Sequence, residues 1–418
     1  MARAVEIVYP VCCGIDVHKN FLVACIATTD ERGHTTHLIR RFSTNTGDLR
    51  RLADWLEDNN CKDVCMESTG KYWIPVFNIL EQTCNVTLTH PKYVKAIKGK
   101  KTDKKDAKWI AELFKCDLVR SSFIPPHDIR QLRDLCRYHM KLTYMNTSEK
   151  NRSQNCLTTC NFKLDAVFSD IFGKSATRIL EALISQGNSD FEIAPLLDRR
   201  CKATVEEVAA ALDGELSFAQ GEKLKIIRSH MENLKGLKDT LESLIYQLAI
   251  PFQSEIDLLL TVPGISSPLT AIRILAEIGA DMSVFETSKH LCSWAGVTPQ
   301  NNESAGKKKT TRISRAGAYL KPLLVQISLA ACKSNKHPEL KDKYQVLKKR
   351  RGHKKAVIAI SRRLLTAIWH ILSKREVYND KLYRKADKPP ANRILTPEQA
   401  FAILRSKGYQ IEISEPAA

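Results

Sequence analysis

The sequence predicts an α/β domain over residues 1–124, a long helical or coiled-coil segment over 125–254, a mainly α-helical domain over 255–378 and a tail over 379–418. Three observations predict this order. In the first domain, short apolar and β-branched runs are interspersed with helical patterns. A pair of prolines (FIPP) then precedes two long stretches of helical periodicity. In the last domain, helical patterns are joined by a Pro-Gly turn and by a polar, cationic loop.

The composition is typical of a soluble globular protein with a polyanionic partner. Of the 418 residues, 43% are hydrophobic and 27% are charged, and the formal net charge is +19 with a pI near 9.3. This excess of positive charge favours nucleic acid over a membrane surface as the partner. No stretch holds eighteen uncharged apolar residues, and the N-terminal run lacks a small-residue cleavage site, so we expect neither a membrane span nor a signal peptide.

The cysteines do not follow a metal-binding pattern. The chain has thirteen of them, but none forms a C-x-x-C pair. Zinc frameworks require such paired ligands. We therefore expect the cysteines to be buried free thiols.

The elements of the first domain can be predicted in order. VCCGIDVHKN, FLVACIATT and HLIRRFST predict three successive strands. TGDLRRLADWLEDN begins with Thr-Gly and has apolar residues at helical spacing, so it predicts a helix. CKDVCMEST and CNVTLTHP predict two more strands, and DKKDAKWIAELFKCDLV closes the domain as an amphipathic helix. Three strands followed by helix, strand, helix, strand and helix is the order of a ribonuclease-H-like sheet.

The middle segment is predicted to contain two long helices, over residues 127–165 and roughly 204–250. In the second, EKLKIIRSHMENLKGLKDTLESLIYQLAI repeats apolar residues at intervals typical of a coiled coil or a helical hairpin. The segment between the two is less regular, and we interpret it as a plain helical spacer. A helical arm of this kind suits dimerisation or contact with nucleic acid.

Four carboxylates of the first domain are candidates for one metal site. Asp16 lies inside the apolar strand GIDVHK, where an unpaired charge costs several kcal/mol, and Glu67 ends the strand in VCMEST. Asp103 and Asp106, in KKTDKKDAKW, share one face of the closing helix. Carboxylates without paired His or Cys ligands suit Mg²⁺, and four of them can hold two ions about 4 Å apart. Each acid alone is more typical of a cap, an ion pair or a solvated helix face; in ribonuclease-H order, together they favour the metal site.

Lysines surround the aspartate pair of the closing helix. Lysines attract a polyanion, whereas two neighbouring carboxylates repel it unless a cation lies between them. We therefore expect these lysines to hold phosphates beside the metal ions. The candidates are Lys100, Lys101, Lys104 and Lys105.

The loop VTPQNNESAGKKKTTRISRAG is a second candidate centre. A serine hydroxyl such as that of Ser304 becomes a good nucleophile only with help from a base or nearby cations, and phosphoryl transfer requires neutralised charge on the phosphate oxygens. A basic loop that grips phosphate, in which Ser304 only donates a hydrogen bond, is an alternative that the residues leave open. Ser314 and Tyr319 are competing hydroxyls. The cations that follow Ser304 are Lys307, Lys308, Lys309, Arg312 and Arg315.

Two further stretches are candidates for contact with the nucleic-acid backbone. VPGISSPLTAIRILAEIG resembles a helix-hairpin-helix, whose turn at Gly264 presents backbone N–H groups to a phosphate, although an ordinary helical turn fits equally well. KDKYQVLKKRRGHKKAVIAISRR adds a basic stripe beside an apolar helix, which suits binding without base specificity. Its candidates are Lys348, Lys349, Arg350 and Arg351.

Motifs in both halves of the chain, spread over residues 10–375, carry a family resemblance. They are GIDVHK, MESTGKYW and KTDKKDA in the first half, and VPGIS, FETSKHLCSWAGVTPQNNESAGKKK, ISRAGAYLKPLL and RRGHKKAVIAISRRLL in the second. On these motifs the chain resembles the transposases of the insertion sequence 110 family. The resemblance implies a DEDD-type recombinase with a RuvC-like N-terminal domain and a C-terminal transposase domain.

The resemblance also implies roles for residues and partners. The family's acidic residues match the four carboxylates above, and its nucleophilic serine best matches Ser304; the family often has Gly next, where this chain has Ala305, and Ser314 matches less well. It implies serine attack on a DNA phosphate, giving a phosphoserine and a free 3′-hydroxyl, with metal assistance. It further implies homo-oligomers, dimeric or tetrameric, whose active sites combine residues of two protomers. A structured bridge RNA would guide donor and target DNA, in the cytoplasm of a prokaryote.

Two other functions are compatible with the residues. A RuvC-like structure-specific endonuclease would use the acids alone to activate water, so cleavage would survive Ser304→Ala without covalent protein–DNA adducts. A non-catalytic nucleic-acid-binding protein would show no metal-dependent strand breakage, so Asp16→Asn would have no such activity to remove. Unchanged strand breakage in that variant would remove the metal-site assignment.

Overall fold

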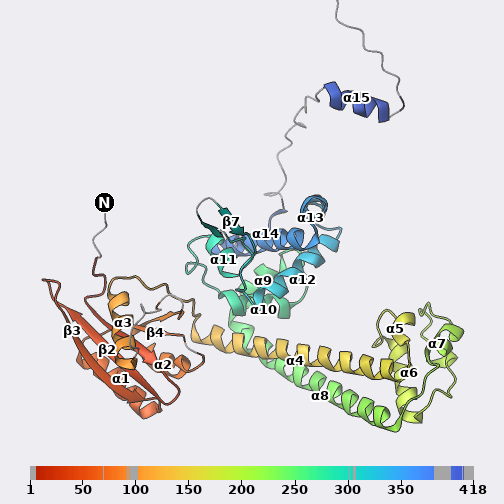
Figure 1. Ribbon diagram of the computed structural model, residues 1–418, viewed down its shortest axis with the longest axis horizontal. Helices are drawn as coiled ribbons and strands as arrows, with labels where there is room; N and C mark the ends of the chain where they lie inside the picture. Colours follow the sequence, from red (N-terminus) through yellow and green to blue (C-terminus); the bar gives the residue numbers. More distant parts are fainter. Residues whose placement is uncertain are drawn as a thin grey trace, which may run out of the picture. The chain divides into compact units, whose positions relative to one another are not determined.

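The computed structural model describes residues 6–68, 70–91, 94, 102–300, 302–304, 307–380, 397–406 and 408. The chain forms two compact units, Met1–Pro126 and His127–Ala418 (Figure 1). The first is an α/β unit built on a sheet, and the second is mostly helical. The predicted α/β domain followed by a helical body is therefore confirmed.

The first unit is built on a five-stranded mixed sheet in the order β3-β2-β1-β4-β5. β1 (Val11–Val17) and β2 (Phe21–Thr29) pair antiparallel, as do β2 and β3 (Thr35–Ser43). β4 (Asp63–Glu67) runs parallel to β1, and β5 (Asn85–Thr89) runs parallel to β4. Three antiparallel strands followed by two parallel ones is consistent with the ribonuclease-H-like sheet that the element order predicted.

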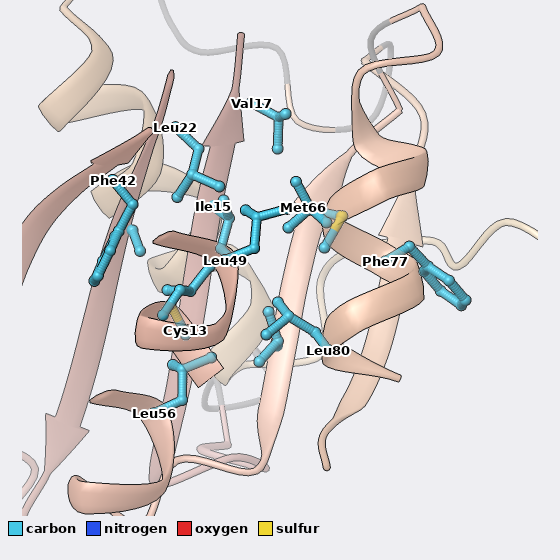
Figure 2. Packing of buried hydrophobic residues seen from close by; sticks show 14 of the residues in the cluster. Cys13, Ile15, Val17, Leu22, Phe42, Leu49, Leu56, Met66, Phe77 and Leu80 are labelled. Carbon is cyan, nitrogen blue, oxygen red and sulfur yellow. The ribbon is translucent and has the colours of Figure 1, made fainter. Parts of the chain in front are cut away.

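Different helices cover the two faces of this sheet. Alternate side chains of β1 point to opposite faces, so Cys13, Ile15 and Val17 lie in a core with α1 (Thr46–Asp58) and α2 (Trp73–Leu80), as Figure 2 shows. On the other face, buried side chains of α3 pack against β1, β2 and β4. The bounds of α3 are Asp103–Lys115. The sheet is therefore a buried middle layer, and its two faces are distinct environments.

Two long helices dominate the beginning of the second unit. α4 (His127–Thr159) and α8 (Phe218–Ala249) pack along one another, each about 50 Å long at a rise of about 1.5 Å per residue (Figure 1). Of the two predicted arrangements, the structure has the helical hairpin. The second helix was predicted to begin near residue 204 but begins at Phe218, because the side chain of Ser217 accepts a hydrogen bond from the Gln220 amide and caps it.

The connection between these helices is more than the plain spacer that the sequence predicted. It contains short helices around a core of its own, in which Phe162, Ile179 and Leu183 are fully buried or nearly so. A capping box at Thr204 and Glu207 starts one of them. The elements are α5 (Leu164–Val167), α6 (Lys174–Gln186), η1 (Ala194–Leu196) and α7 (Val205–Ala211).

The remainder of the second unit is a helical bundle with one small hairpin. Helix α14 (His353–Lys374) packs against α9, α11, α12 and α13. It is long and apolar enough to span a membrane by composition, but 56% of its most apolar stretch is buried among these helices, as in a core helix. The other elements are η2 (Ile250–Phe252), α9 (Gln253–Leu260), α10 (Pro268–Ile278), α11 (Ser288–Trp294), β6 (Asn302–Ser304), β7 (Lys307–Thr310), α12 (Leu320–Lys333), α13 (Pro338–Arg351) and α15 (Pro397–Ser406).

All thirteen cysteines are free, and most are buried, as predicted. Burial raises the pKa of Cys12 and of Cys61 to about 12. Because the thiolate is the reactive form, these thiols are chemically inert near neutral pH and serve as small apolar side chains.

Candidate active site

Strand β1 directs Asp16 toward the face of the sheet that α3 covers. Asp16 shares this face with Cys12 and Gly14, since side chains two residues apart point the same way. The Cys12 thiol donates a hydrogen bond to the carbonyl of Ala111 on α3 at 3.7 Å. The Asp16 side chain is only 14% exposed, so its carboxylate lies largely out of water.

The parallel pairing of β1 and β4 brings Glu67 level with Asp16. Ile15 is paired with Met66 in the register, so the residues that follow each lie at the same height. Cys65, two residues before Glu67, packs in the core on the α3 side, so Glu67 faces that side too. The two acids thus end neighbouring strands on one face of the sheet.

A glycine allows α3 to lie close enough to deliver the other two acids. A Cβ on Gly14 would lie 2.3 Å from the backbone nitrogen of Ala111 and 2.4 Å from the carbonyl oxygen of Ala107. Helix α3 runs antiparallel to β1, because the carbonyl of Lys115, at its C-terminus, accepts hydrogen bonds from amides that precede β1. Its first turn therefore lies at the end of β1 that carries Asp16.

The first turn of α3 contains both remaining acids. Thr102 caps the helix, and its side chain accepts a hydrogen bond from the Lys105 amide at 3.4 Å. Asp103 and Asp106 occupy the turn that follows, where the helix dipole stabilises negative charge. Lys104 and Lys105 lie in the same turn and are exposed, whereas Lys100 and Lys101 lie outside the described residues.

Electrostatics indicate that the four acids form one cluster. Burial raises the pKa of Asp16 above its ordinary value, and the charges of Asp106, Glu67 and Asp103 raise it further, while His18 opposes them. Carboxylates act on one another in this way only at short range. The charges of the other three candidate acids therefore all act on Asp16, although the four residues are up to 90 positions apart in the chain. Of the four, Asp16 and Asp103 belong to the group whose ligand atoms all lie within 4.8 Å of one another among the described residues.

The structure adds His18, which sequence analysis did not include among the site residues. Its Nε2 lies 3.3 Å from an Asp16 oxygen and 3.5 Å from an Asp103 oxygen. One ligand atom from each of these three residues lies within 4.8 Å of the others, a spacing that can hold a metal ion. The signal in the sequence was the position of His18 in GIDVHK, two residues after Asp16 and directly after the last residue of β1.

The second centre contains a short β-hairpin, where the sequence predicted an exposed loop. Ser304 is the last residue of β6 and is paired with Lys307, the first residue of β7, so both lie next to the tip of the hairpin. The side chains of Ser304 and of Lys307, Lys308 and Lys309 lie outside the described part of the structure. Arg312 and Arg315 follow the hairpin, and both are exposed.

The competing hydroxyls have structural partners. The Oγ of Ser314 accepts a hydrogen bond from the Ala316 amide at 3.3 Å, and its carbonyl accepts one from the Lys321 ammonium at 2.7 Å. The ring of Tyr319 lies 4.4 Å from the guanidinium of Arg137. These contacts give Ser314 and Tyr319 roles in packing that do not require catalysis.

The predicted nucleic-acid contacts of the second unit have different surroundings. Gly264 turns the chain between α9 and α10 at φ +87°, and a Cβ there would lie 2.2 Å from the Ile327 carbonyl oxygen, so packing against α12 already requires glycine. Ser267 caps α10 by accepting a hydrogen bond from the Thr270 amide. The last turn of α13 is fully accessible, and its exposed cations are Lys348, Lys349, Arg350 and Arg351.

Comparison with known proteins gives consistent matches. A family model for DEDD transposases of the IS110 type, described as Transposase, matches residues 13–162. A second, described as Transposase IS116/IS110/IS902 family, matches residues 256–345. The chain is also 29% identical over 121 residues to the transposase for insertion sequence element IS1111A of Coxiella burnetii, which covers 28% of this chain. The aligned part spans about a third of that relative's length, 33%. Since models for both halves match in order, the chain belongs to the IS110 family of transposases.

Proposed function

We propose that this protein is a DNA transposase that cuts and rejoins DNA with a serine nucleophile and a metal-assisted acidic site. The observation that carries the proposal is the cluster of Asp16, Glu67, Asp103 and Asp106 at one end of a ribonuclease-H-like sheet. The chain's net charge of +19 supports a nucleic-acid substrate.

The donor set of the cluster suits divalent metal ions, and we propose that it holds two Mg²⁺ ions. With all four carboxylates ionised, mutual repulsion and the burial of Asp16 are unfavourable, as the raised pKa of Asp16 indicates. A divalent cation offsets this repulsion, and Mg²⁺ prefers carboxylate oxygens and retained waters. When bound, Mg²⁺ supplies positive charge that stabilises the attacking and leaving oxygens of phosphoryl transfer.

We assign the nucleophile to Ser304. The Ser304 hydroxyl loses its proton as its Oγ forms a bond to a DNA phosphorus, the bond from that phosphorus to the 3′ oxygen breaks, and the 3′ oxygen takes up a proton to become a free hydroxyl. Attack by a 3′-hydroxyl on the phosphoserine releases the serine and rejoins the strand. Support comes from the backbone register of the hairpin, which pairs Ser304 with Lys307, and from the run of cationic residues that follows Ser304 in the sequence, because cations stabilise charge on phosphate oxygens.

The proposal includes three partners: donor and target DNA, a structured guide RNA, and further copies of this chain in a dimer or tetramer. Exposed cations on α3 and α13 support contact with a phosphate backbone. The family resemblance supports the RNA and the oligomer. Sequencing the nucleic acid that co-purifies with the protein tests the guide: a single discrete RNA supports it, and a random mixture contradicts it.

Strand cleavage by three variants tests the chemistry. Purified protein with its co-purifying RNA is incubated with element DNA and Mg²⁺, and covalent protein–DNA adducts are separated on denaturing gels. We expect Asp16→Asn to lose strand breakage, and Ser304→Ala to lose adducts, whereas the matched variant Ser314→Ala keeps them. Cleavage by Ser304→Ala without adducts would indicate a RuvC-like endonuclease, and normal breakage by Asp16→Asn would remove the metal site.

A further inference from the structure

We infer that His18 is a ligand of the metal centre, beside Asp16 and Asp103, and that the centre therefore binds Mn²⁺ in preference to Mg²⁺. The inference rests on the proposed function, because it requires that the carboxylate cluster holds a divalent cation. It changes the predicted oxygen-only donor set into a mixed nitrogen and oxygen set.

The first argument is the distance between donor atoms. A divalent ion with ligand bonds of about 2.1 Å places adjacent ligands about 3 Å apart and opposite ligands about 4 Å apart. The Nε2 of His18 lies 3.3 Å from an Asp16 oxygen and 3.5 Å from an Asp103 oxygen. Both distances fit adjacent positions around one ion after a small adjustment of the side chains, and the three donor atoms all lie within 4.8 Å of one another.

The second argument is that a direct hydrogen bond does not account for this position. N–H···O hydrogen bonds are usually 2.7–3.2 Å long, and both carboxylate distances from His18 exceed that range. The Nε2 atom is buried and has no hydrogen-bond partner among the described residues. Its two neighbours Asp16 and Asp103 lie at ion-pair distance without forming a hydrogen bond. A buried polar atom that makes no hydrogen bond is unfavourable, and a metal ion between it and the two carboxylates satisfies all three groups.

The third argument is that the imidazole is held in place. His18 lies in the short turn between β1 and β2, and its amide donates a hydrogen bond to the Phe21 carbonyl at 2.9 Å. The two rings pack at a centroid distance of 4.7 Å, and the guanidinium of Arg41 on β3 covers the Phe21 ring at 3.9 Å. A ligand fixed by a rigid sheet and by packing keeps the geometry that a metal site needs.

The choice of metal follows from the donor atoms. Carboxylates accept both Mg²⁺ and Mn²⁺, but Mg²⁺ takes oxygen ligands and gives up its waters reluctantly, so one imidazole nitrogen in the donor set disfavours Mg²⁺ more than the larger transition ion Mn²⁺. We therefore expect His18→Gln to weaken Mn²⁺ binding by about tenfold or more, as measured by titration calorimetry, since even loss of a group behind a ligand costs about 10–100-fold. Mg²⁺ binding should change by less than about threefold, because its ligands are the oxygens.

A spectroscopic test detects the bond itself. The full-length protein is loaded with Mn²⁺, and pulsed electron paramagnetic resonance measures hyperfine coupling from directly bound nitrogen. We expect a ¹⁴N coupling that changes to that of ¹⁵N when histidine is isotopically labelled, and that is lost in His18→Gln. His34→Gln is the matched control, because His34 is an exposed histidine of the same unit that lies 3.7 Å from a carboxylate of Asp30, away from the cluster.

The outcomes separate this inference from the proposed function. Mn²⁺ binding that requires Asp16 but shows no nitrogen coupling would overturn the role of His18 and leave the carboxylate site intact. Equal loss of Mn²⁺ and Mg²⁺ affinity in His18→Gln would overturn the metal preference. Mn²⁺ binding that Asp16→Asn does not weaken would overturn the metal centre altogether, and the inference with it.

Discussion

Gly14 of β1 lies against Ala111 of α3 so closely that a Cβ on the glycine would come within 2.3 Å of the alanine's backbone nitrogen. This contact sets the distance between the sheet and the helix that carries Asp103 and Asp106. Because a Cβ cannot approach backbone atoms this closely, any larger residue at position 14 must displace α3. The acidic cluster therefore depends on a residue that has no side chain.

The first prediction is that Gly14→Ala destabilises the first unit. Overpacking a tight interface costs about 1–3 kcal/mol, and here backbone atoms must move. The free energy of unfolding, measured in urea, should fall by this amount, and divalent-metal affinity should fall with it. Gly47→Ala is the control, because Gly47 lies in α1 with nothing within 4 Å of its Cβ position, and alanine there should stabilise the helix by up to about 1 kcal/mol. Equal unfolding midpoints for Gly14→Ala and wild type would contradict the close approach.

The second prediction concerns charge repulsion at Asp16. Its pKa is raised in the folded state by burial and by neighbouring carboxylates, so the folded protein holds this proton more tightly than the unfolded chain. The stability of the metal-free protein should therefore fall as pH rises from the ordinary value of 3.8 through the raised folded value. Above that window, Asp16→Asn should be more stable than wild type in a chelator.

A divalent metal ion should reverse this order of stability and make wild type more stable than Asp16→Asn. At a concentration of 100 Kd, a bound metal stabilises the native state by about 2.7 kcal/mol, so the melting temperature of wild type should rise while that of Asp16→Asn stays nearly constant. Thermal melts in chelator and in Mn²⁺ measure both effects. A chelated Asp16→Asn protein that is less stable than wild type would show that the carboxylate has a favourable partner within the protein.

The third prediction is a pH dependence from His139, which is buried where α4, α8 and α10 meet. Its Nε2 lies 2.7 Å from an oxygen of Glu242, and its Nδ1 contacts the guanidinium of Arg273. The neutral ring fits this place, since Nε2–H donates to the carboxylate and Nδ1 accepts from Arg273. Burial, followed by the charge of Arg273, accordingly lowers the pKa of His139 below 6.5.

Because the unfolded chain binds this proton more readily, stability should be complete above pH 6.5 and should be lost as pH falls toward the lowered folded pKa. Urea unfolding of the full chain between pH 5 and 8 measures the slope. His139→Gln should flatten it, although that variant should be less stable at every pH by about 1–3 kcal/mol, the cost of leaving buried groups unpaired. His34→Gln, on the surface, should keep the wild-type slope, and an unchanged slope in His139→Gln would contradict the assignment.

The fourth prediction separates packing from phosphate binding at Gly264. Gly264→Ala combines a positive φ with a Cβ only 2.2 Å from the Ile327 carbonyl oxygen, whereas Gly352 has φ +83° with open space around it. Alanine at position 352 should cost about 1–3 kcal/mol for backbone strain alone, because φ +83° with ψ 164° is a conformation that essentially only glycine adopts, and at position 264 about 1–3 kcal/mol more. Unfolding in urea checks the difference. Similar costs, together with a selective loss of DNA binding at position 264, would favour the phosphate seat instead.

The fifth prediction concerns the last turn of α13. Arg350 and Arg351 are exposed, so Arg350→Gln with Arg351→Gln should weaken binding to all DNA sequences alike and reduce the slope of log affinity against log salt by about 2. Fluorescence anisotropy over a salt series measures the slope. The matched control is Arg50→Gln with Arg51→Gln, an exposed pair on α1, which covers the face of the sheet opposite the acidic cluster. An equal change in slope for both pairs would indicate a general charge effect.

Local patterns in the amino-acid sequence are enough to predict the elements of the first unit and the identity of the candidate acids. Strand and helix periodicity depends on neighbours a few positions away, so β1 to β5 and α3 could be predicted from short windows. An aspartate inside an apolar strand is likewise visible locally, which is why Asp16 was identified. The two family models, over residues 13–162 and 256–345, match parts of the chain that contain the short motifs on which the family resemblance rests.

Relations between residues that are far apart in the chain follow only from the packing of the folded unit. Glu67 lies level with Asp16 because β1 and β4 pair in a parallel register. Helix α3 lies close to β1 because Gly14 has no side chain, although in the sequence Gly14 is only one glycine in a strand. His18 became part of the site because the turn after β1 and the ring of Phe21 fix its imidazole between two carboxylates. Local patterns carry no distance between such groups, because that distance is set by the packing of backbone and side chains once the whole unit has folded.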